Sequence, residues 1–210
     1  MDLIQSELFD RFSFRLMGAQ DIDKVPIMCQ GERREILARI KSLGSSAVVV
    51  FEGKKHIAQL QFRAHVKGSY SPNGLWDPLY WGDFKNIETE LPTNTLVIYC
   101  YHVGQIDDTE NRNKEYQGLG IGRAMLEYLL DWAEEAGFSC IAVKATPESR
   151  PVMSFMGGQP VSVYESYGFK VIGSAIDEQL LNVVMEKGLA SKETNLNDIA
   201  LVSLCVKHFD

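Results

Sequence analysis

The segment Gln117–Arg123, with the sequence QGLGIGR, has residue types and a spacing that suit the binding of a phosphate group. Glycines occupy positions 118, 120 and 122, directly before a run of residues with helical periodicity. Because glycine inside a helix costs roughly 1 kcal/mol relative to alanine, three of them at a helix start need a reason. A helix start exposes unpaired backbone N–H groups, and glycine lets a ligand approach them closely. The pattern therefore predicts an anion site for phosphate or pyrophosphate.

Two common phosphate-binding motifs do not fit this segment. A Walker A loop has Lys and then Ser or Thr after its last glycine, whereas this chain has Arg123 and Ala124. A dinucleotide-binding fingerprint directly follows a strand, and the next strand ends in an acidic residue. Here a polar loop precedes the glycines, and the next strand runs into Lys144. Both motifs are therefore disfavoured, and the ligand needs another identification.

A third pattern does fit, and a second motif accompanies it. Gln117–Gly122 matches Q/R-x-x-G-x-G/A, and the segment Tyr164–Phe169, YESYGF, follows after one more strand and a short helix. With both motifs in this order, the chain resembles the GNAT superfamily of N-acetyltransferases, most strongly over residues 95–173. The resemblance implies an α/β fold, with a GNAT-type mixed central sheet that is flanked by helices and splayed at the acetyl-CoA site.

The resemblance also implies roles for individual residues. Backbone amides of the first motif would hold the pyrophosphate of acetyl-CoA, and the end of the preceding strand would pair with its pantetheine arm. Tyr164 would lie near the sulfur and protonate the leaving thiolate, as a general acid of suitable basicity. The implied cofactor-binding residues are Tyr101, His102, Val103, Gln117, Gly118, Leu119, Gly120, Ile121, Gly122, Arg123 and Tyr164.

The general base is not evident from the sequence. His102 has a suitable intrinsic pKa and stands at the end of a strand, which makes it a candidate catalytic residue beside Tyr164. The acidic run Asp107–Glu110 is also compatible with plain solvated surface. Cys100 reads as an inert thiol in a buried strand, and Cys100 with His102 makes no metal site without further ligands. We therefore expect no metal.

The order of predicted elements agrees with one α/β domain over residues 1–210. We expect a first strand at Ser13–Met17, helices at Ala19–Gln30 and Gly31–Gly44, and a hairpin of Ala47–Glu52 with Lys55–Phe62. A strand at Thr95–Val103, a helix at Leu119–Ala136 and a strand at 139–145 form a βαβ unit. A short helix at Pro160–Gly168, a hairpin of 169–176 with 180–188, and an extra C-terminal strand at about 197–209 complete the domain.

Two regions have more than one interpretation. An insertion at about 64–94, with Trp76, Tyr80 and Trp81, either covers the core or forms a lid over a substrate pocket. The segment Thr146–Pro160, rich in glycine and proline, either lines the acceptor site or covers the core. The C-terminal strand either extends the sheet or crosses to a second subunit, which makes a homodimer possible.

Composition limits the function classes. The net charge is −7, with no cluster of basic residues, so we expect no nucleic-acid partner and a mild preference for cationic substrates. The N-terminal sequence does not resemble a signal peptide, and no apolar run is long enough to span a membrane. The four scattered cysteines suggest reduced thiols and a cytoplasmic location.

These observations favour an acetyl-CoA-dependent N-acetyltransferase (an acyltransferase) in which the primary amine of a small molecule attacks the acetyl group directly. Two alternatives stay open at this point. One is acetylation of a protein lysine or N-terminus, which an open acidic groove would favour. The other is a non-catalytic acyl-CoA-binding regulatory module, which would have a cofactor site without a productive acid or base.

Overall fold

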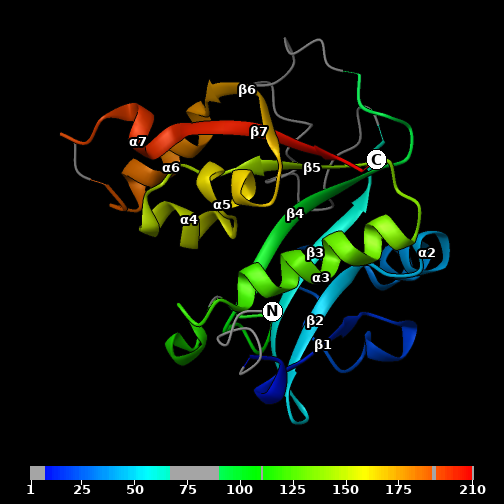
Figure 1. Ribbon diagram of the computed structural model, residues 1–210. Helices are drawn as coiled ribbons and strands as arrows, with labels where there is room; N and C mark the ends of the chain where they lie inside the picture. Colours follow the sequence, from blue (N-terminus) through cyan, green and yellow to red (C-terminus); the bar gives the residue numbers. More distant parts are fainter. Residues whose placement is uncertain (1–7, 67–89, 110, 191–192, 210) are drawn as a thin grey trace. The chain divides into compact units, whose positions relative to one another are not determined.

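The computed structural model describes residues 8–66, 90–109, 111–190 and 193–209 (Figure 1). Most of the predicted insertion, including Trp76, Tyr80 and Trp81, lies outside the described residues. The chain divides into two compact units. The first unit comprises the described residues up to Arg63 together with Cys100–Gly137, and the second comprises the other described residues. The single domain expected from the sequence stays a prediction.

Seven strands form one open mixed sheet in the order β1-β2-β3-β4-β5-β7-β6. Their bounds are β1 Ser13–Leu16, β2 Ala47–Glu52, β3 Lys55–Ala64, β4 Thr95–Val103, β5 Cys140–Ala145, β6 Lys170–Ile176 and β7 Leu201–His208. The pairs β1–β2, β2–β3, β5–β7 and β6–β7 are antiparallel, whereas β4 and β5 are parallel. This architecture confirms the predicted fold class, a mixed sheet flanked by helices.

The parallel ladder is short. It joins Thr95–Ile98 of β4 to Cys140–Val143 of β5, while β4 continues to Val103. In β5, Lys144 and Ala145 still pair with β7. The ladder thus ends at Ile98, five residues before the end of β4.

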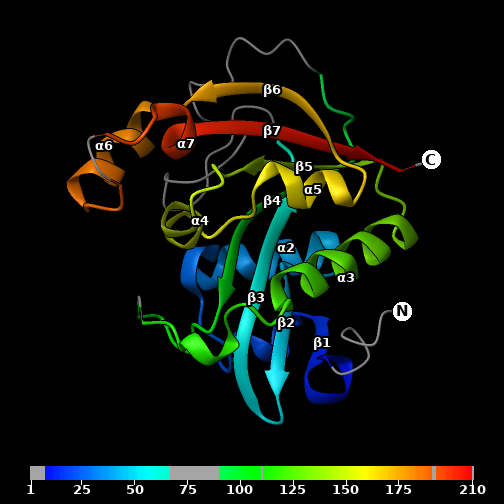
Figure 2. The ribbon, with the colours of Figure 1, turned by 60° about the vertical axis from the view of Figure 1, so that its left-hand side comes forward.

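The first unit places one helix on each face of its strands. Its elements besides strands are the 3-10 turns η1 Ala19–Asp21, η2 Met28–Gln30 and η4 Lys114–Tyr116 and the helices α2 Arg33–Leu43 and α3 Ile121–Glu135. Side chains of a strand alternate between faces, and Ala47 and Val49 of β2 pack in one apolar cluster with Ile36 of α2. Helix α3 contacts β1 and β2. Figures 1 and 2 show α2 and α3 on opposite sides of these strands.

The second unit contains the helices α4 Arg150–Met156, α5 Val161–Ser166, α6 Glu178–Glu186 and α7 Leu196–Ala200. One apolar cluster joins α4, α6 and α7 to β5 and β7, with fully buried Val152, Leu180, Val184, Ala142 and Val202 among its members. A buried ion pair adds a polar link, because Lys144 Nζ of β5 lies 2.5 Å from the carboxylate of Asp177. Asp177 also caps α6 by accepting a hydrogen bond from the N–H of Leu180.

Three expectations from the sequence are wrong. Ala19–Gln30 is not one helix but the two short turns η1 and η2, since Pro26 lacks the N–H that a continuous helix would use. The second arm of the predicted closing hairpin, 180–188, is part of helix α6 and the turn after it. The strand that pairs with β6 is instead β7, which follows helix α7 in the chain. In the sheet, β7 lies between β5 and β6 rather than at an edge.

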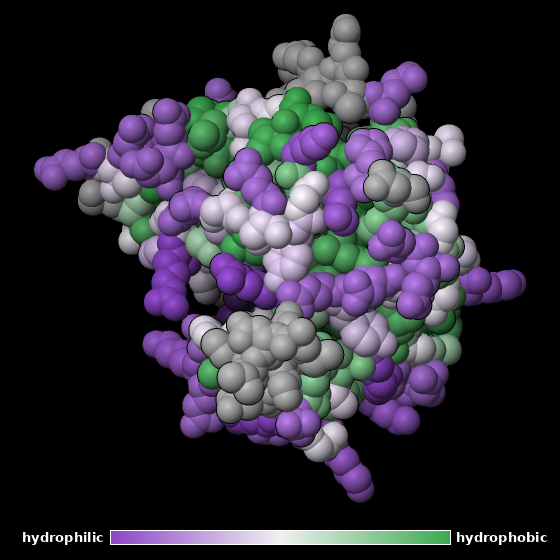
Figure 3. Space-filling model, in the orientation of Figure 1, coloured by the Kyte–Doolittle hydropathy of each residue, from purple (hydrophilic) through white to green (hydrophobic). Residues whose placement is uncertain are grey.

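Most other predicted bounds agree within two residues. Strand β4 has the predicted limits, α2 ends at Gly44 in a left-handed conformation (φ +88°), and α3 is followed by Gly137 (φ +77°). No described helix is long and apolar enough to cross a membrane. On the face drawn in Figure 3, hydrophobic and hydrophilic residues are intermixed.

Candidate functional site

The glycine segment forms the start of helix α3, as predicted. Gly118 (φ +78°) and Gly120 (φ +85°) are both left-handed, and Gly120 is the residue that caps the helix. This conformation is strained for residues with a β-carbon, which explains the two glycines. Among the described residues, a β-carbon at Gly120 would meet only the side chain of Leu8, at an ordinary contact distance of 3.5 Å. No described residue blocks the space in front of the helix start on the side of this glycine.

Backbone donors are concentrated at this helix start. Within the described part of the chain, the five consecutive N–H groups of residues 118–122 donate no hydrogen bond. The next two, of Arg123 and Ala124, both donate to the carbonyl of Gly120 at 3.0 Å and so close the first turn. Gly118 is exposed, and Leu119 and Gly120 are half-buried. An anion at this point would satisfy several donors at once and would face the positive end of the helix dipole.

Tyr116 anchors the segment just before the glycines. Its ring is buried, and its hydroxyl donates to the carboxylate of Glu52, at the end of β2, at 2.7 Å. This hydrogen bond raises the pKa of Tyr116 and lowers the pKa of Glu52. Asn113 caps the turn η4 by accepting from the N–H of Glu115. The bond from Tyr116 to Glu52 thereby ties the loop to the sheet of the first unit.

The predicted pantetheine-binding residues form the end of β4. Tyr101 and His102 are buried, and Val103 is half-buried. The strand ends at Gly104, which has φ +78° and whose N–H donates to the carbonyl of Ile57 in β3. A β-carbon at Gly104 would lie 2.3 Å from the carbonyl oxygen of Asn113. Only glycine fits this close approach, which brings the strand end and the glycine segment into the same unit.

A chain of hydrogen bonds orients His102. Its Nδ1 lies 2.9 Å from Oε1 of Gln105, while Nε2 of Gln105 donates to the carbonyl of Thr109 at 2.5 Å. Because the amide nitrogen of Gln105 is committed to that carbonyl, its oxygen faces the imidazole and Nδ1 must be the donor. The other ring nitrogen, Nε2, is buried and has no hydrogen-bond partner among the described residues.

Cys29 joins His102 and Cys100, a contact that the sequence did not reveal. The sulfurs of Cys29 and Cys100 are 3.7 Å apart, and both lie with a ring nitrogen of His102 within 4.8 Å of one another. The neighbouring Cys100 thiol is the largest cause of a lowered pKa of Cys29, and His102 lowers it further. The hydrogen bond between the two thiols, together with burial, raises the pKa of Cys100. The only local hint of this contact in the sequence was the presence of a cysteine in each of the two segments, Cys29 in η2 and Cys100 in β4.

Tyr164 belongs to the second unit, on helix α5, whereas the other predicted site residues belong to the first. It is fully buried, and its ring packs against Phe169 with centroids 5.2 Å apart. The N–H of Phe169 donates to the carbonyl of Tyr164, which fixes the turn of the YESYGF motif. Tyr164 and Phe169 therefore have a structural role in the second unit, beside the catalytic role that the resemblance implies for Tyr164.

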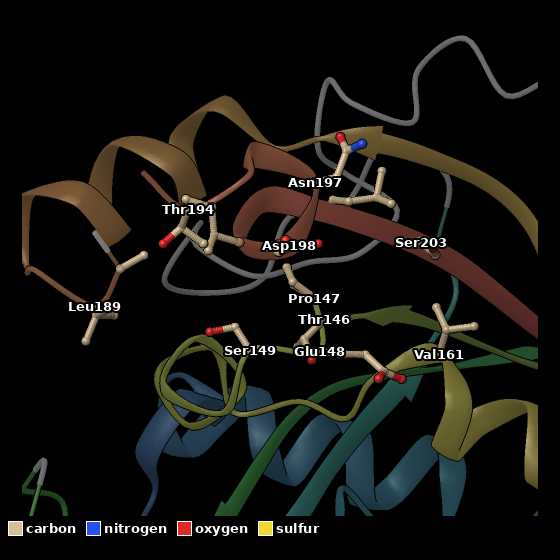
Figure 4. A pocket seen from close by; sticks show the side chains of 13 residues that line it. Thr146, Pro147, Glu148, Ser149, Val161, Leu189, Thr194, Asn197, Asp198 and Ser203 are labelled. Atoms are coloured by element: carbon tan, nitrogen blue, oxygen red, sulfur yellow. The ribbon is translucent and has the colours of Figure 1, made fainter. Parts of the chain in front are cut away.

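The second unit contains a pocket of about 410 Å³. Figure 4 shows Glu148 and Ser149, from the segment after β5, across the pocket from Asn197 and Asp198 of α7. Thr146 also lines it, and its buried hydroxyl has no hydrogen-bond partner among the described residues. Two carboxylates with hydroxyl and amide groups suit a cationic, hydrogen-bonding ligand. The predicted wall segment thus does line a pocket at its N-terminal end.

Comparison with known proteins gives a match to one family model over part of the chain, and a fold. The sequence pattern of the acetyltransferase (GNAT) family matches residues 78–157, which include Gln117–Gly122 but end before Tyr164. No curated protein matches the sequence. A GNAT-family acetyltransferase from Streptococcus pneumoniae is 12% identical, with a TM-score of 0.53 and coverage of 95% of this chain and 99% of that one.

Two further structures are similar in fold. An N-acetyltransferase from Staphylococcus aureus is 11% identical, with a TM-score of 0.51 and coverage of 94% of this chain and 98% of the other. The ribosomal-protein-S18-alanine N-acetyltransferase from Escherichia coli is 11% identical, with a TM-score of 0.48 and coverage of 94% and 93%. At such an identity the likeness to the Staphylococcus aureus structure describes the fold alone, and the Escherichia coli structure, with a TM-score under 0.5, supports no conclusion.

Proposed function

We propose that this chain, which contains a GNAT acetyltransferase domain and uses acetyl-CoA, acetylates the primary amine of a small molecule by direct attack of the amine on the thioester. The family gives the reaction class and the acetyl donor. The nature of the acceptor and the roles of individual residues are our proposal.

One observation carries the placement of the cosubstrate, namely the five unpaired N–H groups of residues 118–122. A pyrophosphate has enough oxygens to accept from several of them, and each such bond to a charged oxygen contributes about 1.5–3 kcal/mol. The residues present therefore fit the group without a basic side chain. We propose that Gln117–Arg123 hold the pyrophosphate and that backbone groups of Tyr101–Val103 pair with the pantetheine arm.

Acetyl-CoA supplies the acetyl group, activated as a thioester. We propose that Tyr164 donates its phenolic proton to the thiolate that leaves. A tyrosine and a thiol have similar intrinsic basicity, so the proton moves between them at little cost.

The pocket of the second unit supports a small cationic acceptor. Glu148 and Asp198 would attract an ammonium group, and the unpartnered hydroxyl of Thr146 offers a hydrogen bond to it. A volume of about 410 Å³ suits a small molecule better than an extended peptide. A base role for His102 stays a prediction, since one of its ring nitrogens lies within 4.8 Å of two thiols.

The alternatives make different predictions. A protein acetyltransferase would acetylate a peptide lysine or N-terminus and ignore free amines. A regulatory module would bind acetyl-CoA without releasing CoA. A cytoplasmic location is part of the proposal, supported by four cysteines that are all free thiols.

The first test is calorimetric titration of the protein with acetyl-CoA, with NAD as the negative ligand. We expect micromolar binding of acetyl-CoA that Gly120→Glu abolishes, because the new carboxylate repels the pyrophosphate. Gly44→Glu is the matched control: Gly44 also has a positive φ (+88°) and open space around it, but it ends helix α2. Loss of binding in both variants, or in neither, would contradict the proposed pyrophosphate site at Gln117–Arg123.

The acceptor is then tested by CoA release from acetyl-CoA in the presence of small primary amines or of lysine-containing peptides. The proposal expects turnover with small amines. Turnover with peptides alone would favour the protein-acetylating alternative, and binding without turnover of either class would favour the regulatory module.

A further inference from the structure

We propose that Cys29, Cys100 and His102 form a zinc site in the first unit. All three residues belong to that unit, and theirs is the one group of three potential metal ligands found among the described residues. Two thiolates and an imidazole are ligands that Zn²⁺ prefers, and the three leave a fourth position for solvent or a substrate atom. This inference does not depend on the acetyltransferase reaction, and it departs from the expectation of no metal.

The distance between the sulfurs supports a shared metal. Two sulfurs that each lie about 2.3 Å from a tetrahedral Zn²⁺ are about 3.8 Å apart. The sulfurs of Cys29 and Cys100 are already 3.7 Å apart. A ring nitrogen of His102 and both sulfurs lie within 4.8 Å of one another, so a modest contraction around an ion brings all three into range. Binding would convert the two thiols to thiolates and release their protons to solvent.

The orientation of His102 provides independent support. Gln105 fixes Nδ1 as the hydrogen-bond donor, which leaves the lone pair of the neutral ring on Nε2. His102 is only 5% exposed, and its Nε2 has no other partner among the described residues. A buried acceptor without a partner is costly, and a metal ion would satisfy it. Ligating histidines usually donate their second N–H to a neighbouring oxygen, as His102 does to Gln105.

The backbone beside Cys29 is held in an unusual conformation. Met28 is the one described residue other than glycine with a positive φ, +52°. Its N–H donates to the carboxylate of Asp108, in the loop after β4, at 2.8 Å. Gln59 of β3 donates to the carbonyl of Pro26 at 2.8 Å and so fixes the start of the same segment. These bonds compensate the strain and hold Cys29 beside β4, which indicates a functional constraint.

A disulfide between the two cysteines is the competing explanation for the short sulfur distance. It would need an oxidant and would leave the buried Nε2 of His102 without a partner. The zinc site accounts for all three side chains and for the bond to Gln105. With zinc bound, His102 would have no lone pair for a proton, so a base role in catalysis would be excluded.

The test is titration of the reduced, chelator-treated protein with Co²⁺, a spectroscopic substitute for zinc, in the absence of oxygen. We expect one equivalent to produce a sulfur-to-cobalt charge-transfer band in the near ultraviolet and the visible bands of a four-coordinate ion. One equivalent of Zn²⁺ should remove both signals. Elemental analysis of protein purified without chelator should find zinc at about one ion per chain.

Variants assign the ligands. Cys29→Ser should lose about half of the charge-transfer intensity and bind Co²⁺ at least 100-fold more weakly, and Cys29 is only half-buried, so the fold tolerates this change. Gln105→Leu should weaken binding about 10–100-fold, as loss of a bond to a ligating histidine does. Cys205→Ala, at a buried thiol of the second unit, is the control and should bind normally. Absence of the charge-transfer band in the folded wild type, or its full retention in Cys29→Ser, would overturn the proposal.

Discussion

The thiols of Cys29 and Cys100 lie in contact, at 3.7 Å, although 71 positions separate them in the sequence. The contact arises because the turn η2 is tied to the loop after β4 by the bond from Met28 to Asp108. The same region carries His102 and the end of β4, which the family resemblance assigns to the cosubstrate. Because Cys100 directly precedes Tyr101 in β4, any ligand of the two thiols would lie next to the proposed pantetheine-binding residues.

Substitution of Tyr164 by phenylalanine tests the proposed general acid. Phenylalanine keeps the ring against Phe169 and removes only the hydroxyl, so the fold should be retained. We expect kcat to fall by about 10²-fold or more, with little change in the affinity for acetyl-CoA. Steady-state kinetics of CoA release and calorimetry check the two quantities.

Tyr167→Phe is the matched control, because Tyr167 belongs to the same motif and is only half-buried. It should have near wild-type kcat. If the two variants behave alike, the hydroxyl of Tyr164 has no special part in the reaction.

Removal of the pocket carboxylates tests the acceptor site. Glu148→Gln with Asp198→Asn keeps the shape of the side chains and removes two negative charges from the pocket. We expect the KM for a cationic amine to rise about tenfold, with a smaller effect on a neutral acceptor and none on acetyl-CoA binding. Glu186→Gln, at an exposed position of α6, is the charge control and should leave the KM unchanged. An unchanged KM in the double variant would place the acceptor elsewhere.

Substitution of Gly104 tests the turn that ends β4. Gly104→Ala introduces a β-carbon 2.3 Å from the carbonyl oxygen of Asn113, in addition to the unfavourable positive φ. Gly53→Ala, at the hairpin turn between β2 and β3, has a positive φ as well but open space around it. We expect Gly104→Ala to lower the free energy of unfolding by at least about 1–2 kcal/mol more than Gly53→Ala does. Denaturant titration measures both, and equal losses would mean that the turn relaxes freely.

The buried His56 predicts acid sensitivity. Burial is the largest cause that lowers the pKa of His56 to about 4, and the charge of His102 lowers it further. A hydrogen bond with the Ala58 backbone and the charge of Asp108 raise this pKa and so oppose part of the effect. The unfolded chain therefore binds a proton near pH 6.5 that the folded chain binds only near pH 4. The contribution of His56 to stability should be constant above pH 6.5 and fall, by on the order of 1 kcal/mol per pH unit, as the pH decreases from 6.5 to 4.

The comparison variant for this effect is His56→Leu, measured in the presence of a chelator so that metal release does not contribute. Its free energy of unfolding should depend less on pH over the same interval. Parallel pH profiles of the two proteins would show that another group causes the acid sensitivity.

The sequence predicted the elements whose pattern is local. The run of β-branched and aromatic residues in Thr95–Val103 and the apolar periodicity of α3 between glycines define their own limits. The motifs Gln117–Gly122 and Tyr164–Phe169 are also local, since each is a contiguous segment, and they indicated the fold class. The N–H groups of residues 118–122 that donate to no described residue lie at the helix start that the glycines predict.

Features that depend on distant contacts could not be predicted in this way. The apolar residues of 180–188 suit a strand or a helix, and the packing of Leu180 and Val184 against β5 and β7 favours the helix. Cys29 has no local motif, and its partners come from β4. The place of β7 between β5 and β6 depends on pairing across long stretches of chain.

That place of β7 has a consequence for biosynthesis. Strands β5 and β6 have no direct ladder with each other, and both take their partner from Leu201–His208. On the ribosome, β5 and β6 emerge well before the strand that joins them, so the sheet of the second unit closes only late in translation. The first unit has β1, β2 and β3 in consecutive order and can form its antiparallel pairs while the rest of the chain is still being made. A nascent chain interrupted before Leu201 would thus expose unpaired strand edges, which are the natural targets of chaperones.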